Sequence, residues 1–146
     1  MRYWLLVATV LTLAACGHKD SPQIKEALKI HEENLALSKS FQDQLQTEID
    51  ATRVAWNESL ASEDTLTGVR LENTLKMLEE KKIALDAWTA SVVEIPGHHH
   101  HEPGEPCDHD HSQDAILENL PDEEILNMQK ELKQQLDAII AKTPLP

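Results

Sequence analysis

The sequence predicts an all-α protein, in which an antiparallel helical hairpin and a third helix form a coiled-coil-like three-helix bundle with a flexible histidine-rich loop. The chain of 146 residues has only four glycines and 3% aromatic residues. Long stretches lack both glycine and proline, which favours helices over a turn-rich sheet. Apolar residues recur in steps of three and four in three separate segments, and this spacing is typical of one helix face.

Residues 1–15 have the form of a lipoprotein signal peptide, with one basic residue followed by a short apolar run. That run is too short to span a bilayer, because a transmembrane helix needs about 20 residues. Leu13-Ala14-Ala15-Cys16 resembles the lipobox of bacterial lipoproteins, which implies cleavage before Cys16 and acylation of its thiol and amino group. An ordinary signal peptide that ends near a cysteine is the alternative. Gly17 in place of aspartate favours the outer membrane, facing the periplasm.

The first helix follows a short lipidated tether, residues 16–21. Ser21 is the expected N-cap, and Pro22 suits the first helical position. No glycine or proline then occurs up to about Leu60, so the helix would be about 55 Å long, which favours coiled-coil pairing. Its expected core stripe is Ile24, Leu28, Leu35, Leu45, Ile49, Trp56 and Leu60.

A polar break at Ala61 to Gly68 separates this helix from a second one, expected from about Val69 to Val93. The short connection implies an antiparallel hairpin over residues 22–93. Trp56 and Trp88 lie at stripe positions, and we interpret them as residues that anchor the core. The second stripe is Leu71, Leu75, Leu78, Leu85, Trp88 and Val92.

Residues 94–120 are rich in histidine, proline, glycine and acid, and this composition predicts a solvated loop. A third helix of the same domain is expected over residues 121–142. Proline opens it, and three carboxylates follow at the positive end of its dipole. Its stripe is Ile125, Met128, Leu132, Leu136 and Ile139.

The loop also holds the one dense group of candidate metal ligands. Imidazole nitrogens and a thiolate suit Zn²⁺, Cu²⁺ or Ni²⁺, and nearby carboxylates raise the local cation concentration. The candidate ligands are His98, His99, His100, His101, Cys107, His109 and His111. The alternative is a solubilising spacer that binds metal only incidentally.

Two further residues need an interpretation. Cys107 has no second cysteine to pair with once Cys16 carries lipid, so no intramolecular disulfide is expected. His31 lies on the core stripe of the first helix. We interpret it as a structural residue with a hydrogen-bond partner, and a ligand role, reached if the loop folds back, is the alternative.

The composition also argues against several classes of function. The formal net charge of −13 leaves no basic patch for nucleic acid. An enzyme is not expected, because the chain lacks a glycine-rich phosphate loop, a Gly-x-Ser-x-Gly turn and a His-Glu-x-x-His helix.

The lipobox, the helix opening Glu26–His31, Trp88 with the following Val93–Gly97, the histidine-rich loop and the closing helix resemble small lipoproteins of Gram-negative bacteria. Some of these carry the label viral A-type inclusion protein-like. The resemblance implies the helical architecture and carries over no catalytic residues.

Two main hypotheses of function remain, and a third possibility is metal sensing, in which ordering of the loop by metal biases the bundle. In the first, a membrane-anchored lipoprotein binds or buffers a divalent transition metal through the loop. In the second, the hairpin is a structural coiled-coil module of the cell envelope and the loop is a spacer. The first helix is longer than the second and has two apolar faces, so part of it needs the third helix, an envelope partner or a second copy to cover it.

Overall fold

The computed structural model is all-helical and confirms the three-helix bundle. It describes residues 21–96, 98 and 117–141. The helices are α1 (Pro22–Ala61), α2 (Thr65–Ser91) and α4 (Asp122–Ala141). The signal peptide, Cys16 and most of the histidine-rich segment lie outside these residues.

Helix α1 is a single helix of 40 residues. It begins where the sequence predicts, because the Ser21 hydroxyl accepts the Ile24 N–H at 3.1 Å and Pro22 follows the cap. It ends at Ala61, one residue beyond the expected end. Its buried side chains follow steps of three and four over most of its length. They are Ile24, Ala27, His31, Asn34, Ser38, Leu45, Ile49 and Ser59.

The turn between α1 and α2 is shorter than expected, and α2 begins at Thr65 rather than at Val69. The carboxylate of Asp64 accepts the Thr67 N–H at 3.2 Å and caps the helix. The predicted break up to Gly68 is therefore wrong from Thr65 onward, because the polar run at Asp64 starts the helix. The hydrogen bonds with Thr67 lower the pKa of Asp64.

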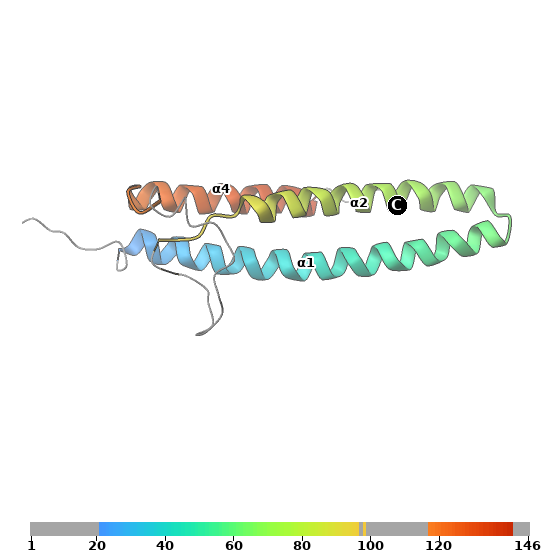
Figure 1. Cartoon of the computed structure of the whole chain (residues 1–146), viewed down its shortest axis with the longest axis horizontal. Coiled ribbons are helices and arrows are strands. Elements are labelled where there is room, and N and C mark those ends of the chain that lie inside the picture. Colours follow the sequence, from blue (N-terminus) through green and yellow to red (C-terminus); the bar gives the residue numbers. More distant parts are fainter. Residues whose placement is uncertain (1–20, 97, 99–116, 142–146) are drawn as a thin grey trace, which may run out of the picture.

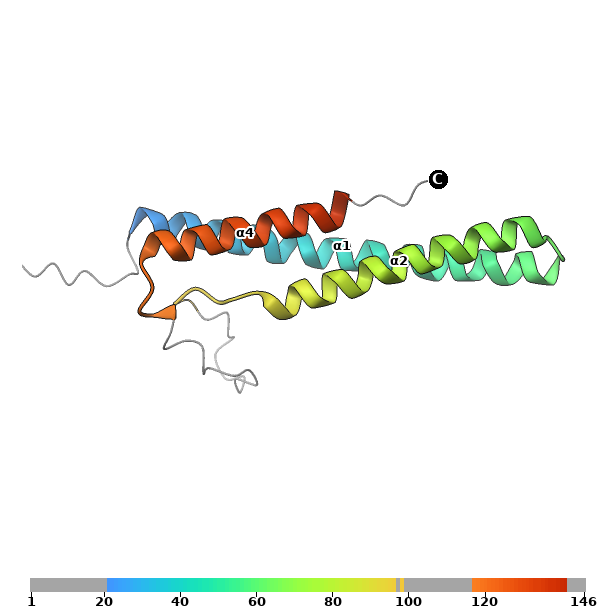
Figure 2. The same cartoon turned by 90° about the horizontal axis from the view of Figure 1, so that it is seen from above.

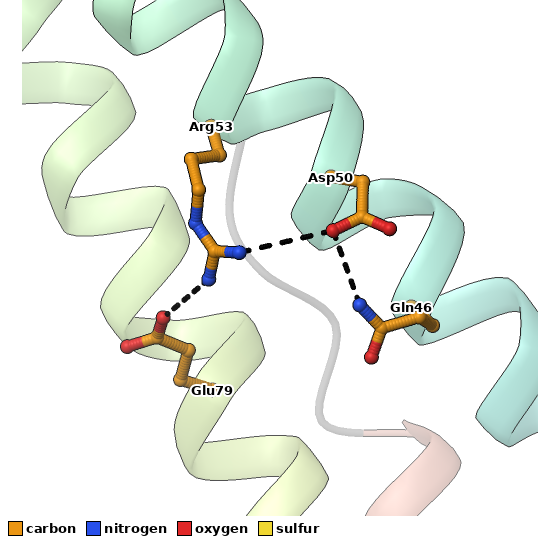
Figure 3. Close-up of polar contacts among 4 residues, drawn as sticks. All are labelled: Gln46, Asp50, Arg53 and Glu79. Atoms are coloured by element: carbon orange, nitrogen blue, oxygen red, sulfur yellow. Dashed lines mark hydrogen bonds and ion pairs between the residues drawn. The ribbon is translucent and has the colours of Figure 1, made fainter.

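The two helices of the hairpin approach closely at the turn. Gly68 is buried against α1, and a Cβ atom there would lie 3.2 Å from the Ser59 hydroxyl oxygen. Further along, Arg53 of α1 forms an exposed ion pair with Glu79 of α2 at 3.2 Å and another with Asp50 at 3.8 Å (Figure 3). Exposed pairs of this kind contribute little to stability, so close packing at Gly68 matters more for the hairpin.

Helix α1 is covered by a different partner at each end (Figures 1 and 2). Helix α4 packs along its N-terminal half, and α2 packs along its C-terminal half. Helices α2 and α4 meet in the middle, where one apolar cluster joins all three. Its buried members are Leu45, Ile49, Leu75, Leu78, Leu85, Trp88, Leu132 and Leu136.

A second, smaller cluster lies where α1 and α4 begin. It contains Ile24 and Ala27 of α1, Ile125 and Leu126 of α4, and Ile95 from the segment after α2. Ile95 is fully buried. The two clusters contain most of the predicted stripes of α2 and α4; the exceptions are Leu71 and Met128, which are half-buried and belong to neither cluster.

The predicted stripe of α1 is wrong at its C-terminal end. Leu60 is 55% exposed, and Ser59 takes the buried position beside Gly68. A serine fits there because the two helices are too close for a leucine. Among the described residues, no helix has both the length and the apolar character needed to cross a membrane.

Candidate functional site

The structure describes only one of the seven predicted metal ligands. His98 is described, whereas His99, His100, His101, Cys107, His109 and His111 lie outside the described residues, as does Cys16. Within residues 21–96, 98 and 117–141, no three His, Cys, Asp or Glu side chains lie close enough to hold a metal ion. The metal site therefore stays a prediction, and the structure shows the base of the segment that would form it.

His98 is held at this base by its backbone. After α2 ends, Val92 is extended and the chain runs back towards the start of α1 (Figure 2). Ile95 inserts into the smaller apolar cluster, and the His98 N–H donates to the Ile95 carbonyl oxygen at 3.0 Å. This bond closes a tight turn at Pro96. The position of His98 is thus set by the burial of Ile95 three residues earlier.

The His98 ring has one buried nitrogen without a partner. Its Nε2 atom is inaccessible to solvent and makes no hydrogen bond within the described part of the chain. A buried polar atom of this kind is rare in proteins, because leaving it unsatisfied costs about 1–3 kcal/mol. A metal ion or a group from the neighbouring segment could satisfy it.

The other end of the histidine-rich segment returns to the same place. Leu117 is buried, and its carbonyl oxygen accepts the Leu120 N–H at 3.1 Å. Leu120 packs against the smaller cluster, the one that holds Ile95. Figures 1 and 2 both show the end of the segment after α2 and the segment before α4 near the beginning of α1. The bundle therefore fixes both ends of residues 99–116 at one end of the molecule.

A layer of buried polar side chains lies beside this end, between α1 and α4. The Gln129 side chain joins three elements: its Oε1 lies 3.3 Å from His31 Nδ1, and its Nε2 donates to the Val93 carbonyl oxygen at 3.1 Å. Asn34 Nδ2 donates to the Gln129 backbone oxygen at 3.4 Å. Because Gln129 Nε2 donates to Val93, its Oε1 is the acceptor, and His31 is therefore the donor through Nδ1.

This layer confirms the structural interpretation of His31, which is buried and hydrogen-bonded. Sequence reasoning missed its companions Asn34, Ser38 and Gln129. The spacing could have indicated Asn34 and Ser38, because positions 24, 27, 31, 34 and 38 follow the alternating steps of three and four that mark one buried helix face. The predicted stripe used Leu28 and Leu35 instead, and these leucines are only partly buried. A single polar layer in a coiled coil fixes the register of its helices at some cost in stability.

Comparisons with known proteins give no further assignment: no family model, curated protein or solved structure matches this chain.

Proposed function

We propose that the protein is a lipid-anchored protein of the cell envelope that captures a divalent transition metal ion through its histidine-rich segment. The observation that carries the proposal is the Nε2 atom of His98, which is buried and without a hydrogen-bond partner in the described residues. A neutral imidazole nitrogen in this state is a suitable metal ligand. The bundle supplies it at a fixed place, at the base of the segment that contains the other candidate ligands.

The chemistry of the segment supports zinc, copper or nickel as the cargo. Three further histidines directly follow His98, and Cys107, His109 and His111 come six or more residues later. Imidazole and thiolate are the ligands that these ions prefer. Because both ends of the segment start from one end of the bundle, closing the segment around an ion costs less conformational entropy than closing a free tail.

Helix α1 begins at the same end of the bundle (Figure 1), and the predicted lipidation motif precedes it in the sequence. Acylation at Cys16 would place the metal-binding segment next to the membrane, since only residues 17–20 separate Cys16 from the N-cap Ser21. The proposed location is the outer membrane, facing the periplasm. The anchor itself is testable: native protein should begin at Cys16 and carry the mass of acyl chains. A native protein that begins with Met1 and carries no lipid would contradict it.

Calorimetric titration with zinc and with copper tests metal capture. We expect the chain to bind either ion, with affinity falling near pH 6 as the imidazoles protonate. Alanine at all seven candidate positions should abolish binding, and His98→Ala alone should weaken it about tenfold, as for a lost ligand or its support. The matched control is His18→Ala, which removes a histidine outside the segment.

Circular dichroism should show unchanged helicity in each variant, so that loss of binding is not loss of the fold. If the seven-alanine variant binds metal as tightly as the parent chain, metal capture by this segment is wrong.

A second candidate function, a coiled-coil module that docks on another protein, is favoured by one specific observation. Several large apolar side chains of α2 are exposed, and Leu66 and Ile83 are the most exposed of them, at 65% and 68%. Exposed apolar residues that line one face of a helix are a surface on which a partner helix could pack.

A further inference from the structure

Helix α2 carries a second stripe on its exposed side, although Val69 near the turn also lines a hollow with Trp56 and Leu60 of α1. Positions 66, 69, 73, 76, 80, 83, 87 and 90 follow strictly alternating steps of three and four, and all eight residues are exposed. This is the spacing of a coiled-coil seam. We refer to these residues as the outer seam; they are Leu66, Val69, Asn73, Lys76, Glu80, Ile83, Ala87 and Ala90.

The outer seam is distinct from the core face of α2. The core face uses Leu75, Leu78 and Leu85, which are at most 8% exposed. The apolar members of the outer seam include Leu66, Val69 and Ile83, which are 65%, 51% and 68% exposed. Helix α2 therefore has apolar residues on two faces, and the described chain covers only one of them.

The charge of α2 indicates what could cover the other face. Its four basic residues, Arg70, Lys76, Lys81 and Lys82, balance four acidic ones, Glu72, Glu79, Glu80 and Asp86. In contrast, α1 has four basic and seven acidic residues, and α4 has two basic and five acidic. Two copies of a chain with net charge −13 repel each other over most of their surface. They can approach along α2 with the least repulsion.

We propose that the outer seam is the interface with a second copy of this chain, whose α2 lies antiparallel to the first. An axis of twofold symmetry beside position 78 places Lys76 opposite Glu80 of the second copy, and Glu80 opposite its Lys76. The same register sets Leu66 opposite Ala90 and Val69 opposite Ala87, so that large residues meet small ones, and it sets Ile83 opposite Asn73. A parallel arrangement would instead set Lys76 against Lys76 and Glu80 against Glu80, and like charges in contact select against it.

The interface is one helix wide and has charged residues at its centre. It is therefore a small interface, and we expect a reversible dimer with a dissociation constant of about 1–100 μM, because large apolar area is what makes dimers obligate. This inference sharpens the second candidate function, and it is independent of metal capture, since no residue of the outer seam belongs to the histidine-rich segment.

Sedimentation velocity of the purified chain, in a chelator and over concentrations up to about 500 μM, tests the dimer. We expect a monomer–dimer equilibrium. Lys76→Glu creates two acidic pairs across the axis and Glu80→Lys creates two basic pairs, so each should weaken association at least about tenfold. The double variant K76E/E80K restores opposite charges in every pair, so it should dimerise like the parent chain.

Matched controls change the same charges outside the outer seam. Lys39→Glu and Glu48→Lys lie at exposed positions of α1 and should leave the dissociation constant within about threefold of the parent value. A chain that stays monomeric throughout would overturn the proposal. Equal effects of the seam variants and the controls, or failure of the double variant to dimerise, would also overturn it. The chelator separates this test from the metal titration, so either proposal can fail without the other.

Discussion

The two ends of α1 are stabilised in different ways. At its N-terminal end, α1 packs against α4 through a small apolar cluster and a polar layer in which Gln129 links His31 to the Val93 carbonyl. At its C-terminal end, α1 packs against α2, which is its only partner there among the described residues, through close contact at Gly68 and an exposed ion pair of Arg53 with Glu79. At the first end, the polar layer fixes the register of α4 against α1. The second end, residues 50–72, consists of two helices with apolar residues on its outer side, and we refer to it as the arm.

The difference shows how one long helix can position the histidine-rich segment at one end and leave one face of α2 exposed at the other. The polar layer fixes α4 and the segment after α2 together, so that both ends of the histidine-rich segment meet in one place. Within the part of the chain that the structure describes, no third helix packs along the arm, and the outer seam of α2 is exposed. Substitutions at the two ends should therefore differ in size, and the following variants test this.

The largest difference is expected between the two tryptophans. Trp88 is 4% exposed, and its indole N–H donates to the Leu132 carbonyl oxygen at 2.9 Å, joining α2 to α4. Trp88→Ala should lower the free energy of unfolding by about 3–5 kcal/mol. Trp56 is half-buried in the arm, so Trp56→Ala should lower the free energy of unfolding by only about 1–2 kcal/mol. Urea unfolding followed by circular dichroism measures both, and equal losses would contradict the contrast.

The polar layer gives the next largest effect. Gln129→Met keeps the volume but removes both side-chain hydrogen bonds, leaving the Val93 carbonyl without this donor and His31 without this acceptor. We expect a loss of about 1–3 kcal/mol in urea unfolding. The control is Gln135→Met on the exposed side of α4, which should change stability by less than about 0.5 kcal/mol. Equal losses in the two variants would mean that the layer has no structural role.

The cap of α2 should have a smaller, pH-dependent effect. The pKa of Asp64 is held below its ordinary value of 3.8, so its ionised form stabilises the fold. That stability is present above the unfolded-state pKa and is lost as the pH falls through the folded-state pKa. Asp64→Ala should therefore lower the melting temperature at pH 7, and the difference from the parent chain should shrink as the pH falls below the ordinary pKa of 3.8. A difference that is independent of pH would contradict the capping role.

The smallest effect is expected at Leu60, which is 55% exposed. Leu60→Ala should change the free energy of unfolding by less than about 0.5 kcal/mol, whereas Leu45→Ala, at a buried position of the same helix, should cost about 2–5 kcal/mol. Chemical denaturation of the pair would settle whether the stripe passes through Leu60. A large loss in Leu60→Ala would restore the stripe that the sequence predicts.

Helix existence and order could be predicted from the sequence, because Ser21, Pro22 and the apolar spacing are local signals. The start of α2 could not, since the cap at Asp64 lies within a polar run that also fits a loop. The buried layer was missed because His31, Asn34 and Gln129 are polar, and hydrophobic periodicity does not count polar residues as core. Of the candidate metal ligands, only His98 is within the described residues, so the prediction of a metal site still rests mainly on the sequence.

Hydrogen exchange of the backbone amides, with and without saturating zinc, tests the central claim most directly. If the bundle holds the base of a metal-binding segment, zinc should slow exchange at residues 93–98 and 117–126 and leave the arm, residues 50–72, unchanged. The chain should be kept at about 1 μM, so that association along α2 contributes little. Exchange that is unchanged at the base, or slowed equally in the arm, would contradict the account.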